Sequence, residues 1–369
     1  METLKTLAMM FKKPQYMNLS VVGSPTINNG VASNFSDNDY LNWSNSQEIT
    51  SISDYELCVK FTAGSIGVKQ GICGIAGGQA GAYITNTGIL HIVALDFTNN
   101  KYRDINTNFT LSANTTYYLK CIFRNGNIYG AYSTDGISYT IVQGATATGG
   151  MGSITTLNDF KFGYNNQGSF DGSIDFNPNN SYIKLNGTKY LFQFTMPLTK
   201  AGNPTIVDGV VSGFSSSNYL NMSAYSGTIN SLEFVVKIVT TPTTITNNAL
   251  ILQLLGVPIN IYVKTNKQIT LSYKDTDNTT RYLNSNSTIN VEYYKFVLNN
   301  LGAFMYNSVN GSSWSLLNSY GLIPQQISIS GGKIGYSTST YNVYDGSLDI
   351  GNGNSYIVIN GTKYIFTLP

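Results

Sequence analysis

The chain has 369 residues, of which only 11% are charged, and its formal net charge is +2. This length allows two or three domains of ordinary size, and the near-neutral charge gives no reason to expect nucleic acid or an anionic membrane as a partner. No stretch approaches the roughly 20 apolar residues that a membrane-spanning helix needs, so the sequence predicts a soluble protein.

Residues 1–15 form the first predicted element, because they show a helical spacing of apolar side chains that Pro14 ends. The side chains on the shared face are Leu4, Leu7, Ala8 and Phe11. The segment is either an anchor that docks on a partner or on another copy, or a short helix or tail lying on its own domain. Its apolar run is shorter than the core of a secretory signal peptide, so we expect no cleaved leader.

The rest of the chain is a tandem duplication of one module. The block Phe170–Phe192 matches Tyr344–Phe366 at 14 of 23 positions without a gap. An earlier block, Gly23–Asn42, matches Gly202–Asn221 at 12 of 20 positions. Self-similarity of this kind is the signature of a repeated structural unit.

Both modules consist of short apolar or alternating segments separated by Gly, Asn, Asp and Ser clusters, which indicate β-strands. Matching segments are 56–61 with 233–238 and 117–123 with 291–297, and 88–97 has a weaker counterpart in 268–273. Past residue 15 no window shows a sustained helical period. The predicted fold is therefore all-β, with two tandem jelly-roll β-sandwich domains over 16–195 and 196–369. A short linker at 193–199 predicts modules that are held close together.

Four dipeptides predict hairpin turns of the primed type, in which both residues have positive φ. They are Asp135-Gly136, Asn186-Gly187, Asn310-Gly311 and Asn360-Gly361. At the end of the first module we expect Tyr182–Leu185 to pair antiparallel with Lys189–Phe192.

The repeated motifs resemble those of a known family. They are PTI-x-x-G-V-x-S-x-F near the start of each module, an Asp-Gly or Asn-Gly turn before an aromatic residue, and the closing DGSID…SYIKLNGTKY. They resemble concanavalin A-like lectin/laminin-G jelly-roll modules, especially those of fibre and other virion proteins of tailed bacteriophages of the crAss-like type. The resemblance covers nearly the whole chain past residue 15. It implies two antiparallel sheets, surface display, oligomeric assembly and often glycan binding, but this fold does not fix a ligand.

The sequence offers no clear catalytic group. Glycosidases need a close carboxylate pair, whereas Asp171 and Asp175, like Asp345 and Asp349, would lie roughly 13 Å apart along a strand. We expect these aspartates to accept hydrogen bonds from backbone N–H groups at turns. His91 is the sole histidine, and without a visible partner triad a packed histidine is favoured over a catalytic base. We predict a non-enzymatic protein.

Metal and disulfide chemistry are not expected either. The loop with Asp37 and Asp39 has oxygen donors suited to calcium, but the matching loop 215–218 has no carboxylate, so loop hydrogen bonding is favoured over a metal site. We predict no metal and no cofactor. The three cysteines, which we expect to be buried free thiols, are Cys58, Cys73 and Cys121.

Glycan binding requires exposed aromatic rings for the apolar faces of sugars, with polar side chains for the hydroxyls. The 27 tyrosines are strand formers first, and each ring is more often packed than ligand-binding. The candidate ligand-binding residues are Trp43, Tyr132, Tyr139, Trp314 and Tyr320. Because Met222 replaces Trp43 in the second module, we interpret this tryptophan as dispensable for the core.

These observations favour a non-enzymatic phage virion protein, a fibre, spike or decoration subunit on the virion surface. We expect residues 1–15 to bind other virion proteins, the modules to bind a host-surface glycan, and the chain to form a homo-oligomer. The alternatives are a bacterial carbohydrate-binding module or glycosidase accessory protein, and an architectural spacer without a ligand.

Overall fold

The computed structural model describes most of the chain beyond the first 14 residues. The described residues are 15–43, 54–75, 80–96, 101–124, 127–143, 160–243, 245, 247–256, 258–290, 292–336, 341–351 and 353–369. The predicted N-terminal segment therefore lies outside them, apart from Gln15, which begins the first strand.

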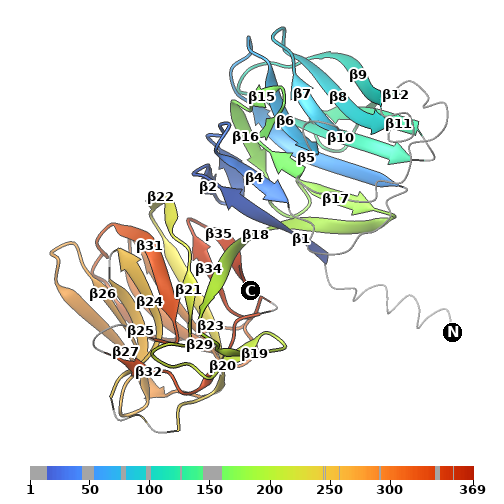
Figure 1. Cartoon of the computed structure of the whole chain (residues 1–369). Coiled ribbons are helices and arrows are strands. Elements are labelled where there is room, and N and C mark those ends of the chain that lie inside the picture. The colour runs from blue at the N-terminus through green and yellow to red at the C-terminus, as the bar shows by residue number, and fades with distance from the viewer. Residues whose placement is uncertain are drawn as a thin grey trace. The chain divides into compact units, whose positions relative to one another are not determined.

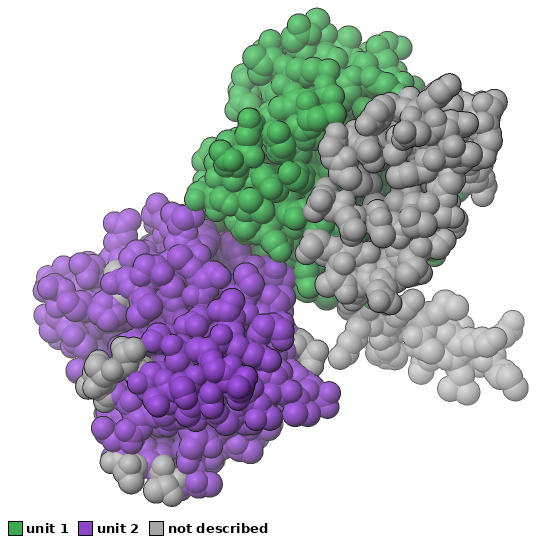
Figure 2. Space-filling view, viewed as in Figure 1, with its two compact units in different colours: residues 1–194 green, residues 195–369 purple. Residues whose placement is uncertain are grey.

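The described elements are all β-strands arranged in sandwich-like sheets, which confirms the predicted fold class (Figure 1). Contacts divide the chain into two compact units, 1–194 and 195–369, shown in different colours in Figure 2. Within the described residues, no helix has the length and apolarity to cross a membrane.

The first sheet of unit 1, called the β5 sheet, is built around the long central strand β5. Strands β16 and β17 follow each other along one edge of β5, and β10 lies along its other edge. In order, the strands are β2 (Thr26–Asn28), β3 (Val31–Ser33), β16 (Gly172–Asp175), β17 (Tyr182–Leu185), β5 (Tyr55–Ala63), β10 (Thr116–Arg124), β11 (Asn127–Ser133) and β12 (Thr140–Gln143).

The second sheet of unit 1, called the β6 sheet, includes both the first and the last strand of the module. In order, its strands are β18 (Thr188–Ala201), β1 (Gln15–Val22), β4 (Tyr40–Trp43), β13 (Phe160–Phe162), β6 (Gln70–Ile75), β7 (Ala80–Ile84), β8 (Ile89–Asp96) and β9 (Lys101–Thr110). A separate small hairpin joins β14 (Tyr164–Asn165) to β15 (Gly168–Ser169).

Unit 2 repeats both sheets. Its β23 sheet contains β19 (Thr205–Val207), β20 (Val210–Ser212), β33 (Ser347–Asp349), β34 (Tyr356–Ile359), β23 (Leu232–Thr240), β28 (Tyr293–Asn299), β29 (Gly302–Ser308) and β30 (Ser315–Tyr320). Its β24 sheet contains the end of β18, then β21 (Tyr219–Met222), β31 (Ile327–Ile334), β24 (Ala249–Gly256), β25 (Ile259–Val263), β26 (Gln268–Lys274) and β27 (Thr280–Thr288). Three further strands are β22 (Tyr225–Ile229) beside β31, β32 (Asn342–Val343) beside β24, and β35 (Thr362–Thr367) beside β34.

The core of each unit follows from strand alternation. Successive side chains of a strand point to opposite faces, so Leu57, Val59 and Phe61 of β5 are buried in the core. The facing sheet approaches closely at Gly130 of β11, where an added Cβ would lie 2.6 Å from the Cδ1 atom of Ile92 on β8. The alternate residues of β5 are left to face outward.

The hairpin that ends each module has the predicted turn. Asn186 and Gly187 have φ of 47° and 79°, and Tyr182 pairs with Leu191 in the expected antiparallel register. The same turn recurs at Asn360 and Gly361, with φ of 48° and 76°. Two more turns of this kind, which were not predicted although their dipeptides signal them, are Asn29-Gly30 and Asp208-Gly209.

The primed turn predicted at Asp135-Gly136 is wrong, as is the one at Asn310-Gly311. Only the glycine of each pair has positive φ, and the strands on either side are joined by a longer loop. The Asp135 carboxylate accepts hydrogen bonds from the backbone N–H groups of Ile137 and Ser138, both at 2.8 Å. These N–H groups, followed by the Ser133 hydroxyl, lower the pKa of Asp135 to about 2.

The predicted linker at 193–199 is a strand instead of a loop. β18 runs without a break from Thr188 to Ala201. Its first part belongs to unit 1 and pairs with β1, and its last part belongs to unit 2, where Leu198 pairs with Met222. The alternation of apolar residues continues through Pro197, which is exposed.

Candidate binding face

The outer surface of the β5 sheet carries polar side chains that the strand period places there. Glu56, Cys58 and Lys60 alternate with the core residues of β5 and share the outward face. On the neighbouring strands, Lys120 and Tyr182 both lie opposite Cys58, so five strand positions converge on one patch.

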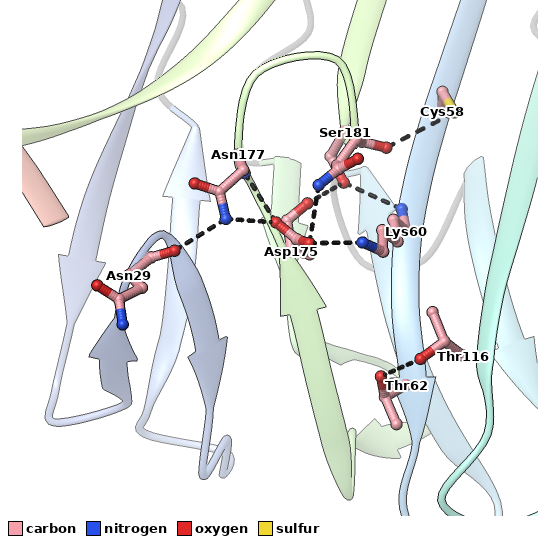
Figure 3. Close-up of polar contacts among 9 residues, drawn as sticks. Asn29, Cys58, Lys60, Thr62, Thr116, Asp175, Asn177 and Ser181 are labelled. Carbon is pink, nitrogen blue, oxygen red and sulfur yellow. Dashed lines mark hydrogen bonds and ion pairs between the residues drawn. The ribbon is translucent and has the colours of Figure 1, made fainter. Parts of the chain in front are cut away.

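An ion pair joins β5 to β16 at one end of this face (Figure 3). The Lys60 ammonium lies 2.9 Å from Oδ2 of Asp175, and Asn180 donates to the same oxygen at 2.8 Å. The other oxygen of Asp175 accepts hydrogen bonds from the backbone and the side chain of Asn177. All the groups around this half-buried carboxylate are donors. The Asn177 contact confirms the predicted backbone hydrogen bond at Asp175.

Unit 2 repeats this ion pair with one difference. Lys237 lies 3.1 Å from Oδ2 of Asp349, and Asn354 donates to that oxygen at 2.8 Å. Gly351 stands where unit 1 has Asn177, and the second oxygen of Asp349 is buried without a hydrogen-bond partner. The two networks thus have the same charged groups, but only the Asp175 carboxylate accepts hydrogen bonds at both of its oxygens.

A second group of residues on the same face, here called the lysine–aromatic cluster, gathers around Glu56. Its members in unit 1 are Glu56, Lys120, Tyr139, Tyr182, Lys184 and Lys189. The Glu56 carboxylate accepts a hydrogen bond from the Tyr182 hydroxyl at 2.8 Å and lies 3.2 Å from the Lys184 ammonium. Lys120 approaches the same oxygen at 3.6 Å.

The aromatic rings of the cluster are partners of its lysines. The Lys120 ammonium lies 4.0 Å from the centroid of the Tyr139 ring, and that of Lys189 lies 4.2 Å from the Tyr182 ring. Cations over ring faces are attracted by the ring quadrupole. These contacts hold the long lysine side chains in defined positions at the surface.

The protonation of the cluster follows from burial and from these partners. Burial alone would raise the pKa of Glu56, but the Tyr182 hydrogen bond and the charges of Lys120 and Lys184 outweigh it and lower the pKa. Burial, followed by the neighbouring charge of Lys184, lowers the pKa of Lys189. Glu56 is therefore a fixed anion at neutral pH among three cations.

Unit 2 has an equivalent lysine–aromatic cluster. Its members are Glu233, Lys295, Trp314, Tyr356, Val358 and Lys363. The Lys295 ammonium lies 4.6 Å from the Trp314 ring, and that of Lys363 lies 3.6 Å from the Tyr356 ring. Burial raises the pKa of Glu233, against the effect of Lys295 and Lys363. Each cluster therefore contains two pairs of a lysine and an aromatic ring.

The structure brings two of the five predicted aromatic residues to this face, namely Tyr139 and Trp314. Trp43 is 1% exposed and packs on Phe160 in the core of unit 1, so its interpretation as dispensable for the core and free for a ligand is corrected. Tyr132 stacks on Phe109 with 4.0 Å between ring centroids. Tyr320, 40% exposed on β30, lies outside the cluster.

His91 has partners that the sequence did not reveal. Its Nδ1 atom lies 2.8 Å from Asp104 and 3.0 Å from the hydroxyl of Tyr83, which stacks on the imidazole ring. The three residues lie on consecutive strands of the β6 sheet, and their contact depends on the register of these strands, which could not be read from the sequence. The pairing holds the imidazole in place, as expected for a packed histidine.

The predicted loop chemistry of Asp39 is confirmed, because its carboxylate accepts hydrogen bonds from the Ser24 backbone and the Ser36 hydroxyl. Among the described residues, no group of three His, Cys, Asp or Glu side chains is placed to hold a metal ion. The three cysteines are buried and free, as predicted.

One further recurring group lies on the outer surface of the β6 sheet. The Lys161 ammonium is 4.3 Å from the Tyr40 ring and 5.4 Å from the Tyr164 ring. The equivalent residues of unit 2 are Tyr219, Lys333 and Tyr336, where both rings again lie beside the lysine. This group was not predicted from the sequence, although a shared Lys-x-Gly-Tyr motif marks it in both modules.

No protein-family model and no curated protein matches the sequence. Among solved structures, the chain is similar to domains LG4-5 of the mouse laminin alpha1 chain, at 10% identity over 94% of this chain and 92% of that one, with a TM-score of 0.33. It is also similar to the botulinum neurotoxin serotype D binding domain, at 10% identity over 95% and 93%, with a TM-score of 0.34. At these values the likeness carries no argument about function, which rests on the chain's own side chains.

Proposed function

We propose that the protein is a non-enzymatic display protein whose modules bind glycans through their lysine–aromatic clusters. The observation that carries this proposal is the recurrence of the cluster after the two modules have diverged. Trp314 stands in unit 2 where unit 1 has Tyr139, yet each ring lies beside the equivalent lysine, Lys120 or Lys295. An exchange that keeps a ring at the surface supports a function for the ring.

The chemistry of the cluster suits a sugar. Aromatic faces accept the apolar faces of pyranose rings, and nearby charged and polar groups exchange hydrogen bonds with the hydroxyls. Tyr182 and Tyr356 supply a second ring in each cluster, so that each face offers two rings together with lysine donors.

The setting we propose is the surface of a bacteriophage virion, in a fibre, spike or decoration subunit that attaches to host glycans as a homo-oligomer. The support for this setting is the resemblance of the repeated motifs to phage virion modules and the tandem duplication. Residues 1–15 would bind the other virion proteins.

A glycan array with the full-length chain tests the binding function. We expect the double variant Tyr139→Ala and Trp314→Ala to bind glycan at least about tenfold more weakly at each of its two sites. Each substitution removes the aromatic ring that lies beside the lysine of one cluster. Tyr320→Ala is the matched control, since it removes an exposed ring outside the cluster and should leave binding unchanged.

A hydrolysis assay on the bound glycans separates this proposal from the alternatives. Turnover of a polysaccharide would contradict the non-enzymatic interpretation and favour a carbohydrate-active enzyme. No glycan binding on the array and no hydrolysis would favour an architectural spacer. Equal losses from Tyr320→Ala and from the cluster variants would remove the cluster as the binding site.

A further inference from the structure

The two lysine–aromatic clusters differ at one position of the same register. Lys184 lies opposite Glu56 on the neighbouring strand, and Val358 lies opposite Glu233 in the same way. Both residues are also paired across their hairpin with a lysine, Lys189 in unit 1 and Lys363 in unit 2. The two clusters therefore differ by the exchange of the Lys184 side chain for that of Val358 at the same position of an equivalent hairpin.

This replacement changes the charge of the face. In unit 1 three lysines surround one glutamate, so the charges of the cluster sum to +2, whereas in unit 2 two lysines and one glutamate sum to +1. The ammonium groups of Lys184 and Lys189 lie 5.5 and 4.2 Å from the centroid of the same Tyr182 ring. Lys184 is ion-paired with Glu56, and Lys189 donates to the Asn179 side chain. Glu56 therefore balances only part of the positive charge, and a ligand anion near both ammonium groups would balance the rest.

Two further replacements make the face of unit 2 more apolar. Trp314 offers a larger ring than Tyr139, whose hydroxyl lies 3.7 Å from the sulfur of Cys58. Val235 takes the place of Cys58 beside the central lysine. An apolar face with fewer cations favours an uncharged sugar with a broad apolar side.

We propose that the two modules bind glycans of different charge: the cluster of unit 1 binds an acidic glycan, holding a uronic or sialic acid carboxylate between Lys184 and Lys189, and the cluster of unit 2 binds a neutral glycan. This inference rests on the proposed glycan-binding function and adds the ligand class of each site. The two ammonium groups beside the Tyr182 ring supply the positive charge that a sugar carboxylate would pair with.

The test uses the full-length chain with one cluster disabled at a time. Trp314→Ala leaves the unit 1 cluster intact, and Tyr139→Ala leaves the unit 2 cluster intact. Calorimetry then measures binding of galacturonic acid hexamer, sialic acid tetramer, heparin hexasaccharide, cellohexaose and hexaglutamate. An array of matched sialylated and asialo glycans measures the ratio of acidic to neutral binding for each chain.

We expect the Trp314→Ala chain to prefer an acidic glycan and to lose about three- to fivefold in affinity when Lys184→Val is added. Raising the salt concentration from about 50 to about 500 mM should weaken this binding. The Tyr139→Ala chain should prefer neutral glycans with little salt dependence, and adding Val358→Lys should raise its acidic-to-neutral ratio by a similar factor.

The outcomes separate the two levels of the proposal. Equal acidic-to-neutral ratios for both chains, or no effect of the Lys184 and Val358 exchanges, would overturn this inference and leave glycan binding intact. Binding of heparin alone would overturn the carboxylate assignment, and equal binding of hexaglutamate would overturn selection of a sugar. If neither chain binds any glycan, the proposed function itself fails.

Discussion

At the scale of single residues, duplication provides an internal comparison. Asp175 has donors on both carboxylate oxygens, whereas Asp349 has a lysine and an amide on one oxygen and no hydrogen-bond partner on the other. A buried polar atom without a partner costs stability. The equivalent carboxylates Asp175 and Asp349 are therefore expected to contribute different amounts to the stability of their units.

We predict that Asp175→Asn destabilises unit 1 by roughly 2 kcal/mol and that Asp349→Asn costs unit 2 clearly less. In unit 1 the new NH₂ group must face a donor, whichever way the amide turns. In unit 2 it can occupy the place of the unpartnered oxygen. Hydrogen exchange read by mass spectrometry measures each unit separately, and equal losses in the two units would contradict the prediction.

The same variant has an expected pH dependence. Burial alone would raise the pKa of Asp175, but Lys60 and Asn177 outweigh it and lower the pKa below its ordinary 3.8. A carboxylate whose pKa is lowered by folding stabilises the native state above its ordinary pKa, and this contribution is lost as the pH falls through the lowered value. The stability difference between the natural chain and Asp175→Asn should therefore shrink in acid.

Residue-level prediction from sequence succeeded only where chemistry is local. The Ser36 hydroxyl donates to Asp39 and the Asn177 backbone N–H donates to Asp175; both contacts join residues two or three positions apart and follow from turn preferences. The Glu56 cluster did not emerge, because Tyr182 and Lys184 are more than 120 positions away from Glu56. Trp43 was misjudged because Met222, its replacement, is also buried and fills the same core position with another apolar side chain.

At the scale of elements, the hairpin that ends unit 1 depends on a glycine with positive φ in its turn. We predict that Gly187→Val destabilises unit 1 by about 1–2 kcal/mol, since Gly187 has φ of 79° and a β-branched side chain is strained there. An added Cβ at Gly187 meets nothing within 4 Å, so steric contact with neighbouring residues does not confuse the result. Thermal unfolding measures the loss.

Gly321→Val is the matched control for this hairpin variant. Gly321 also has open space around it, and its φ is not positive. A loss at Gly321 as large as that at Gly187 would show that side-chain bulk, and not backbone strain, dominates.

The elements also show why identical dipeptides do not give identical turns. Asn186-Gly187 connects two strands directly, so both residues must take positive φ. Asp135 instead uses its carboxylate to hold two backbone N–H groups of a longer loop, and Asn310 does the same with its amide oxygen. The dipeptide signals a turn, and the number of residues between the two strands decides which type of turn forms.

At the scale of the whole molecule, the repeat was readable because the matching blocks contain the strands near the start and at the end of each module, which both units use alike. The strand order of the two units agrees sheet by sheet. The continuous strand between the units was not predicted, since Pro197 and the polar residues around it are typical of a linker. Pro197 is exposed in this strand, and a proline is tolerated in a strand at a position where the ladder does not use its missing N–H group.

The proposed attachment role of the N-terminal segment has a direct test. We predict that deleting residues 1–14 leaves the thermal unfolding of both units unchanged and abolishes incorporation into phage particles. Gln15 is retained because it pairs with Tyr190 in the β6 sheet. Normal incorporation of the shortened chain would remove this segment as the attachment site.

The parallel pairing of β1 with β18 has a mechanical consequence for the first unit. The two strands point the same way, with five residue pairs from Gln15 opposite Tyr190 to Leu19 opposite Phe194. Tension applied at residue 15 and beyond residue 194 pulls them in opposite directions along their length. The five pairs are then loaded in shear and must slip together, so this unit is built to resist stretching along its own chain.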